Sequence, residues 1–274
     1  MSVRSTVIGF CLIACSVFGG VIAYMYLRPY LTTPSARSAT PQQRQALFEM
    51  LQPVTLRNCQ LERFGEAHDG GYLMCGNLLE AVESGYSYGI SGYDKWGCDV
   101  STKHRVTVHQ YDCFDLSQPK CPAGTTVFHP DCVADARRIE EGRVFDTMAD
   151  QIAGNGDATK RVVVKMDVEG AEWQSLLSAP DEVLAQIDQL AIEFHWIEDG
   201  TSLALVSRLK HFFEVAHLHI NNASCTAGME PFPGWAYEVL FVNKRLAVVD
   251  GSVRPARPSP LDSPNIPFIP DCQP

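Results

Sequence analysis

The sequence lacks several patterns that mark common functions. Its 22 Lys and Arg residues form no run, and the formal net charge is −10. A nucleic-acid-binding surface needs a clustered basic face, so no nucleic-acid partner is expected. Neither a GxGxxG nor a Walker A pattern occurs, which disfavours the pyrophosphate-binding loops of dinucleotide and P-loop proteins.

No CxxC pair is present either, so a structural zinc site is only weakly indicated. The chain nevertheless has 10 cysteines, two of them (Cys11 and Cys15) in an apolar N-terminal segment. An even set in the rest of the chain predicts disulfides and a lumenal, periplasmic or extracellular domain, although buried free thiols are an alternative. This set comprises Cys59, Cys75, Cys98, Cys113, Cys121, Cys132, Cys225 and Cys272.

Charge is missing altogether from Val7–Leu27. A helix rises about 1.5 Å per residue, so this segment is long enough to span a bilayer core of about 30 Å. We expect residues 1–28 to be an N-terminal transmembrane anchor, with the remainder lumenal or extracytoplasmic. The alternative is a cleaved signal peptide, processed near "SARSAT", which would give a secreted protein.

The composition shifts beyond the anchor. Residues 29–54 are predicted to be a stalk with a short helix from Gln42 to Leu51. Residues 55–250 have the size of a single α/β domain. Residues 251–274 are rich in proline and predict an extended tail, which Cys272 would tether.

Short apolar runs alternate with amphipathic segments inside the 55–250 region. This alternation predicts a doubly wound, mostly parallel Rossmann-like sheet that ends in an antiparallel strand. Strands are expected at 85–91, 105–112, 161–168, 190–196, 216–223 and 237–244, and helices at 143–153, 171–179 and 202–216. His217 and His219 alternate along one expected strand and are predicted to be partly exposed.

The stretch "VVVKMDVEGAEW" runs from a buried-looking strand into three carboxylates, Asp167, Glu169 and Glu172. Ligands of such sheets bind beyond the carboxyl ends of the strands. We therefore expect Asp167 to lie at the strand's end in a binding crevice. Glu169 and Glu172 have a simpler alternative role, because acidic residues favour a helix N-terminus through its dipole.

A second motif, "SYGISGYDKWGCDVS", places Gly89, Ser91 and Gly92 at the end of another expected strand. Glycines let the backbone approach a ligand closely. Asp112 ends the next strand, and an acid about 20 residues after such a loop can accept hydrogen bonds from ribose hydroxyls. A ribose-bearing ligand without pyrophosphate fits this combination, and S-adenosylmethionine is the obvious candidate.

These motifs resemble the FkbM-type S-adenosylmethionine-dependent methyltransferases, in a membrane-anchored or secreted branch. "VVVKMDVEGAEW" is similar to their K-x-D-x-E-G-x-E signature, and "LAIEFHW" is similar to their next core strand. "HLHINNAS" and "YEVLFVN" resemble their closing region. "RFGEAHDGGYLMC" and the glycine motif are similar to the anchored branch. The resemblance covers about residues 57–243.

The resemblance implies a class I methyltransferase sheet and roles for individual residues. Gly89 and Gly92 would lie against the amino-acid end of the donor, with Asp112 at the ribose. Asp167 would face both the donor and the methyl-transfer centre, and His195 would lie beside it. The acceptor would be methylated on oxygen. An exported location makes a glycan or another small polar molecule a reasonable acceptor.

The residues themselves suit this chemistry. Asp167 or His195 can remove the acceptor's proton. Alternatively, Asp167, His195 and Asn222 can hold a divalent cation that acidifies the hydroxyl. His195 can also be a core-edge histidine, and Asn222 begins a glycosylation sequon that is incompatible with a place in the crevice.

Two further functions remain as alternatives. The unusual glycine loop suits a catalytically silent Rossmann-like ectodomain that serves as a binding or structural module. A nucleotide-dependent dehydrogenase is disfavoured by the missing pyrophosphate fingerprint.

Overall fold

The structure is a computed structural model that describes residues 39–197, 200–256 and 258–272. The expected anchor, 1–28, and the first residues of the expected stalk lie outside these ranges. Within the described ranges, no helix combines the length and the apolar character needed to cross a membrane.

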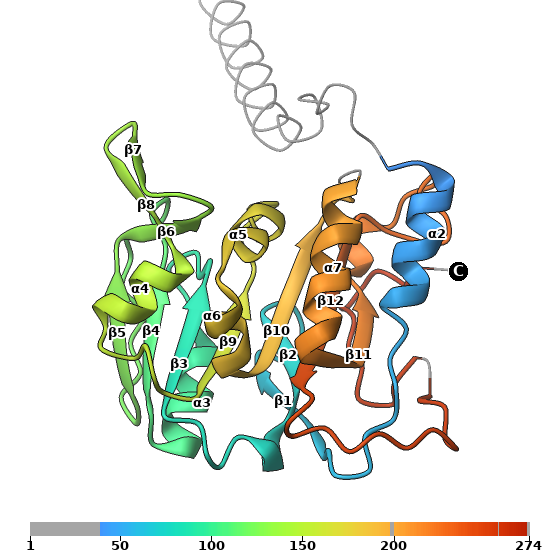
Figure 1. The fold of residues 1–274 in the computed structure, drawn as a ribbon, viewed down its shortest axis with the longest axis horizontal. Helices are drawn as coiled ribbons and strands as arrows, with labels where there is room; N and C mark the ends of the chain where they lie inside the picture. The colour runs from blue at the N-terminus through green and yellow to red at the C-terminus, as the bar shows by residue number, and fades with distance from the viewer. Residues whose placement is uncertain (1–38, 198–199, 257, 273–274) are drawn as a thin grey trace, which may run out of the picture. The chain divides into compact units, whose positions relative to one another are not determined.

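A seven-stranded sheet forms the centre of residues 39–272 (Figure 1). Its order is β11-β12-β10-β9-β3-β4-β5, and β12 alone runs antiparallel to its neighbours. The predicted mixed α/β fold with a mostly parallel, Rossmann-like sheet is therefore confirmed. The strands are β3 (Ser84–Tyr88), β4 (Thr107–Tyr111), β5 (Thr125–His129), β9 (Val162–Met166), β10 (Ile187–His195), β11 (Phe213–Ile220) and β12 (Ala236–Asn243).

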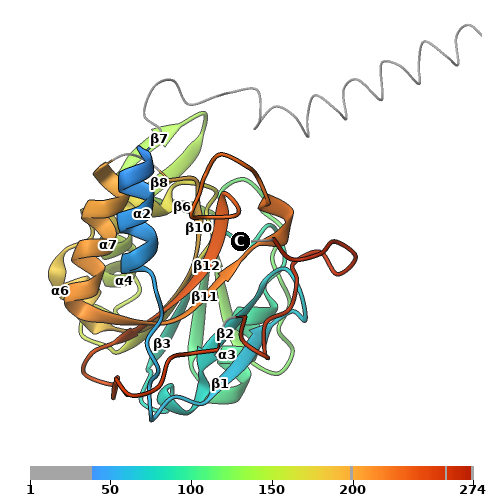
Figure 2. The ribbon, with the colours of Figure 1, turned by 90° about the vertical axis from the view of Figure 1, so that its right-hand side faces the viewer.

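Helices and a hairpin cover the two faces of this sheet (Figure 2). One face packs against α2 (Pro41–Met50), α4 (Met148–Gly154), α5 (Glu172–Ser178), α6 (Asp181–Gln186) and α7 (Gly200–Phe212). The other face packs against α3 (Lys95–His104) and the hairpin β1 (Leu61–Gly65)–β2 (Gly71–Cys75). Strand β9 shows why both faces need cover, because Val162 and Val164 enter one core and Val163 the other.

Helix α2 begins where the sequence expects a short helix. Thr40 caps it, accepting from the backbone N–H of Gln43, whose side chain accepts from the N–H of Thr40. Leu47 and Leu51 are fully buried in the same core as the sheet. Apolar burial therefore joins this helix to the sheet.

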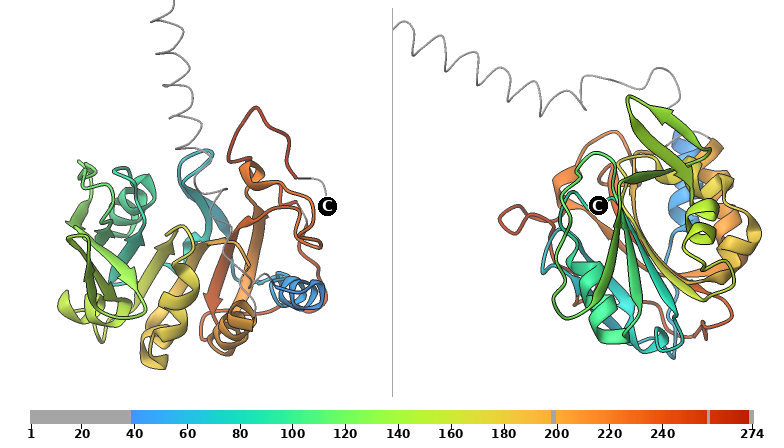
Figure 3. Two further views of the ribbon diagram at one scale, coloured as in Figure 1. Left: turned by 90° about the horizontal axis from the view of Figure 1, so that it is seen from above. Right: turned by 90° about the vertical axis from the view of Figure 1, so that its left-hand side faces the viewer.

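The prediction of one helix over 143–153 is wrong in its first half. Residues Arg143–Thr147 form β8, which pairs with β6 (Asp131–Ala134) and β7 (Arg138–Glu140) in a separate three-stranded sheet. Val144 and Phe145 suit a pleated strand, and the Thr147 side chain then caps α4 by accepting from the N–H of Asp150. Figure 3 shows this small sheet on the β4–β5 side, away from β11 and β12.

The helix expected over 202–216 ends earlier than predicted. It ends at Phe212, and β11 begins at Phe213, paired antiparallel with Asn243 of β12. The prediction that His217 and His219 are partly exposed is also wrong. Both are buried, at 7% and 8% exposure.

Four disulfides confirm the cysteine prediction and supply the pairing that the sequence left open. They join Cys59 to Cys75, Cys98 to Cys121, Cys113 to Cys132 and Cys225 to Cys272. Disulfides persist in oxidising compartments, so the set indicates a secreted or extracytoplasmic protein.

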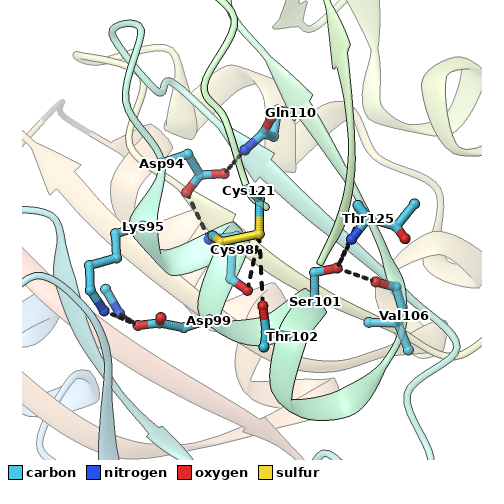
Figure 4. The surroundings of a disulfide bond; sticks show 12 residues. Asp94, Lys95, Cys98, Asp99, Ser101, Thr102, Val106, Gln110, Cys121 and Thr125 are labelled. Carbon is cyan, nitrogen blue, oxygen red and sulfur yellow. Dashed lines mark hydrogen bonds and ion pairs between the residues drawn. A yellow bond between two sulfur atoms is a disulfide. The ribbon is translucent and has the colours of Figure 1, made fainter. Parts of the chain in front are cut away.

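The Cys98–Cys121 bridge fastens α3 to the segment that leads into β5 (Figure 4). Beside it, Asp94 caps α3 through the N–H of Gly97 at 2.8 Å and accepts from the Gln110 amide at 2.8 Å. These contacts hold the N-terminal end of α3, directly after the glycine loop, against β4 and the segment before β5.

Candidate functional site

The loop after β3 is built around a glycine that no other residue can replace without a shift. Gly89 has φ +74°, and a Cβ there would lie 1.7 Å from the backbone oxygen of Asp167. Its N–H donates to the backbone oxygen of Tyr111 at 2.9 Å, and the backbone N–H of Asp167 donates to the backbone oxygen of Tyr88 at 3.1 Å. Gly89 therefore brings the ends of β3, β4 and β9 together.

Asp112 organises the same loop. One carboxylate oxygen accepts from the N–H groups of Ile90 (3.1 Å) and Ser91 (2.8 Å). The other accepts from the N–H groups of Phe114 (2.8 Å) and Asp115 (3.0 Å). A carboxylate has about four lone-pair sites, so these four bonds use its capacity.

A cavity of about 510 Å³ opens where the strand order reverses between β3 and β9. Its volume falls within the range of about 300–1,000 Å³ that is usual for small-molecule sites. The walls are mostly aromatic or aliphatic and the polar groups few. The lining consists of Tyr88, Gly89, Ser91, Tyr111, Asp112, Phe114, Asp115, Cys132, Val133, Phe145, Val168, Glu169 and Ala171.

Gly89, Ser91 and Asp112, all predicted from the sequence, thus line one cavity. Gly92 lies behind this wall, where a Cβ would come within 2.8 Å of an Asp115 carboxylate oxygen. Asp115 itself was not predicted. It is half-buried, lines the cavity, and accepts from the N–H of Ser117 at 2.8 Å.

Asp167 belongs to a second group of side chains beside the cavity. Its carboxylate accepts from the Tyr72 hydroxyl at 3.0 Å, and the Lys165 Nζ lies 3.4 Å away. That ammonium donates to the backbone oxygen of Gly89 at 2.6 Å. The carboxylate side of Asp167 therefore faces this group, while the next residues, Val168 and Glu169, line the cavity.

His195 lies in the same group, as predicted. Its Nδ1 is 2.8 Å from an oxygen of Glu172, and its Nε2 is 3.9 Å from an oxygen of Asp167. Burial alone would lower the pKa of His195, but the hydrogen bond and charge of Glu172, with the charges of Glu193 and Glu169, raise it to about 9.

Glu172 is fully buried and also accepts from the N–H of Val168 at 3.0 Å. It therefore does more than favour the N-terminus of α5, because it fixes both the turn after β9 and the imidazole. Glu169 has the opposite environment, since its side chain is 82% exposed.

Glu193 completes the group and was not predicted. It is buried and accepts from the Asn221 amide at 2.8 Å. Burial, then the charges of Asp167 and Glu238, raise the pKa of Glu193 well above its usual value. Glu238 pairs with Glu193 across the β10–β12 ladder.

The oxygens of Asp167 and Glu193 and a ring nitrogen of His195 lie within 4.8 Å of one another, close enough to share a metal ion. Asn222, the predicted third ligand, is engaged elsewhere. Its amide nitrogen donates to the oxygens of Ile266 (3.0 Å) and Ile269 (2.7 Å). Being 2% exposed, it is also unsuited to glycosylation in the folded protein.

Two residues that were not predicted, Glu193 and Lys165, have a recognisable pattern in the sequence. Glu193 and His195 lie two apart on a strand and so share a face. Lys165 and Asp167 are related in the same way at the end of β9. Tyr72 comes from a distant hairpin, and no local pattern announces it.

No family model, curated protein or solved structure matches the chain significantly.

Proposed function

We propose that the protein is an S-adenosylmethionine-dependent methyltransferase that methylates oxygen on a glycan or another small polar acceptor. The observation that carries this proposal is the placement of a ligand-sized cavity against a buried carboxylate–histidine group. Both lie at the carboxyl ends of β3, β4, β9 and β10, where Rossmann-like sheets bind ligands. The FkbM-like signature around Asp167 and the single antiparallel strand support this assignment.

The cavity suits the donor in two ways. Its aromatic and aliphatic walls, among them Tyr88, Tyr111 and Phe145, favour an adenine ring. Asp112 shapes the glycine loop and lies where a ribose is expected. Asp115 lines the same wall, and its carboxylate accepts fewer hydrogen bonds than that of Asp112. We therefore assign Asp115 a role in accepting hydrogen bonds from the ribose hydroxyls.

The transfer itself is a displacement at the sulfonium methyl. A lone pair of the acceptor oxygen forms the new C–O bond while the S–CH₃ bond breaks and its electron pair stays on sulfur. Asp167, or His195 in its neutral form, takes the hydroxyl proton, a role typically worth about 10²–10⁴-fold in rate. Holding acceptor and methyl in line supplies the rest of the acceleration.

The cellular location belongs to the same proposal. Disulfides and the apolar Val7–Leu27 segment support a single-pass protein whose catalytic domain faces a lumen or the outside, or else a secreted form. Glycans are abundant acceptors in such compartments.

Calorimetric titration with S-adenosylmethionine tests the proposal. We expect saturable binding that Asp115→Asn weakens about tenfold, the loss of about one charged hydrogen bond, without altering thermal unfolding. Asp112→Ala should weaken binding and also destabilise the fold, because four backbone N–H groups lose their acceptor. Glu66→Gln, a change of equal charge outside the cavity lining, is the control.

A second function has its own supporting observation. Both oxygens of Asp112 are already used by backbone N–H groups. That favours a catalytically silent ectodomain whose loop is purely structural. Folded protein that binds no donor up to millimolar concentration would establish this alternative and end the enzyme proposal.

A further inference from the structure

Within the described part of the chain, one ring nitrogen of His195 is hydrogen-bonded and the other is not. Nδ1 meets the buried Glu172 at 2.8 Å. Nε2 has no hydrogen-bond partner among the residues that the structure describes, although the side chain is only 4% exposed. Its nearest carboxylate oxygens belong to Glu169 (3.6 Å), Glu193 (3.7 Å) and Asp167 (3.9 Å).

These separations are too long for hydrogen bonds, yet they converge on one point. Ligand bonds to a first-row divalent cation are about 2.0–2.2 Å, which leaves two ligands of one ion somewhat over 3 Å apart. The ligand atoms of Asp167, Glu193 and His195 lie within 4.8 Å of one another, so these side chains would have to close around an ion.

The orientation of each side chain is also that of a ligand. A metal-binding histidine usually donates its other ring N–H to a carboxylate, which Glu172 provides here. The Tyr72 hydroxyl donates to Asp167 at 3.0 Å, and the Asn221 amide donates to Glu193 at 2.8 Å. Such outer partners fix the direction in which a ligand presents its lone pair.

Carboxylates outnumber the Lys and Arg side chains around these ligands. Asp167, Glu193 and Glu238 bring three carboxylates together. Among the described residues, Lys165 is the only Lys or Arg that forms an ion pair with Asp167. A divalent cation at this place would be attracted by these carboxylates.

We propose that Asp167, Glu193 and His195 bind a first-row divalent cation, with Glu172 as the residue that positions the imidazole. Resting on the proposed methyltransferase function, this inference adds that the ion binds the acceptor oxygen and lowers the pKa of its hydroxyl. Two carboxylates and one imidazole suit ions of the Mn²⁺ to Zn²⁺ series. Asp167 and His195 would then serve as ligands rather than as the base, and the acidified hydroxyl would pass its proton to solvent water.

The test is a Mn²⁺ titration of full-length, chelator-stripped protein, followed by the loss of the free-ion signal in electron paramagnetic resonance. We expect one ion per chain. Glu193→Gln and His195→Gln should each weaken binding at least tenfold. Glu172→Gln should weaken it by about 10–100-fold, as is usual when an outer partner of a ligand is lost.

Two controls separate ligand loss from damage to the fold. Asp157→Asn removes a buried carboxylate far along the sheet and should leave Mn²⁺ affinity unchanged. Thermal unfolding without metal shows whether each variant remains folded. A Glu172→Gln variant that is folded and binds Mn²⁺ as the wild type does would overturn the positioning role.

Donor titration on the same samples keeps the two proposals apart. Mn²⁺ binding without donor binding supports the metal site and removes the methyltransferase. Donor binding without stoichiometric Mn²⁺ binding up to millimolar ion overturns the metal site and leaves the methyltransferase standing.

Discussion

At the scale of single residues, the clearest constraint falls on backbone positions that only glycine tolerates. Gly89 and Gly70 have nearly the same positive φ, +74° and +76°. A Cβ on Gly89 would collide with backbone, whereas a Cβ on Gly70 would meet nothing within 4 Å. The pair therefore separates the cost of the conformation from the cost of the collision.

We predict that Gly70→Ala lowers the free energy of unfolding by only about 1 kcal/mol, the usual cost of a left-handed conformation for a residue with a Cβ. Gly89→Ala should cost more than about 2 kcal/mol, because the strand ends must also move apart. Urea unfolding measures both. Equal losses would mean that the contact between Gly89 and Asp167 does not constrain the loop.

Position in the fold also decides which candidate site residues can be predicted from the sequence. The strand pattern predicts Asp167 at a strand end and the resemblance implies His195 beside it, and the structure brings the two to 3.9 Å. Asn222 was placed with them by resemblance, but tertiary contacts with Ile266 and Ile269 use its amide instead. An asparagine offers no signal in the sequence for which of these partners it will take.

At the scale of elements, β4 and β5 carry a histidine pair, of which His109 is buried and His129 half-buried. Nδ1 of His109 lies 3.0 Å from Nε2 of His129, and Nε2 of His109 lies 3.6 Å from Asp157. Burial, together with the charge of His129, lowers the pKa of His109 to about 4, against the opposing charge of Asp157. The folded chain thus resists protonation that the unfolded chain accepts.

This difference predicts acid sensitivity. His109 titrates near 6.5 when unfolded and near 4 when folded, so the unfolded state binds more protons between these values. Stability should therefore fall as the pH drops from 6.5 toward 4. His109→Gln should remove about 2 kcal/mol of that loss, measured by urea unfolding at both ends of the window.

The exposed His211 supplies the control. A His211→Gln variant should leave the pH dependence unchanged. If His109→Gln also leaves it unchanged, the acid sensitivity arises from other groups.

Errors in predicting elements share one cause. In 143–153 and 202–216 the apolar spacing fits a helix, yet Arg143–Thr147 and Phe213–Ile220 are strands. Phe213 pairs with the distant Asn243, whereas Arg143–Thr147 pairs with the nearby β7 and β6. In both segments the backbone hydrogen bonds of strand pairing override the helical spacing of the apolar residues.

At the scale of the whole molecule, the C-terminal segment covers polar side chains of β11 and β12. Asp262 lies 2.7 Å from Nε2 of His217, and the Asn265 amide donates to Glu238 at 2.8 Å. The Cys225–Cys272 disulfide closes this segment onto the domain. The cover explains why His217 is buried.

We predict that replacing Cys225 and Cys272 together by Ser lowers the free energy of unfolding by up to about 4 kcal/mol, the loop-entropy expectation for this separation. The N–H of Ile266, which donates to Asn222 at 2.9 Å, should exchange faster with solvent. Hydrogen exchange measured by mass spectrometry would show this, with the β9 amides as the internal reference. Unchanged exchange at Ile266 would mean that side-chain contacts alone hold the segment.

The sequence by itself determined the alternation that builds a mostly parallel sheet, the even cysteine set, and the polar residues that end its strands. These follow from local patterns of burial and backbone conformation, which neighbouring residues carry. Only the tertiary structure decided the disulfide pairing, the place of Asn222, and the meeting of Tyr72, Glu172 and Glu193 around Asp167. Those outcomes depend on which distant segments pack together, and packing energy belongs to pairs of segments rather than to either one alone.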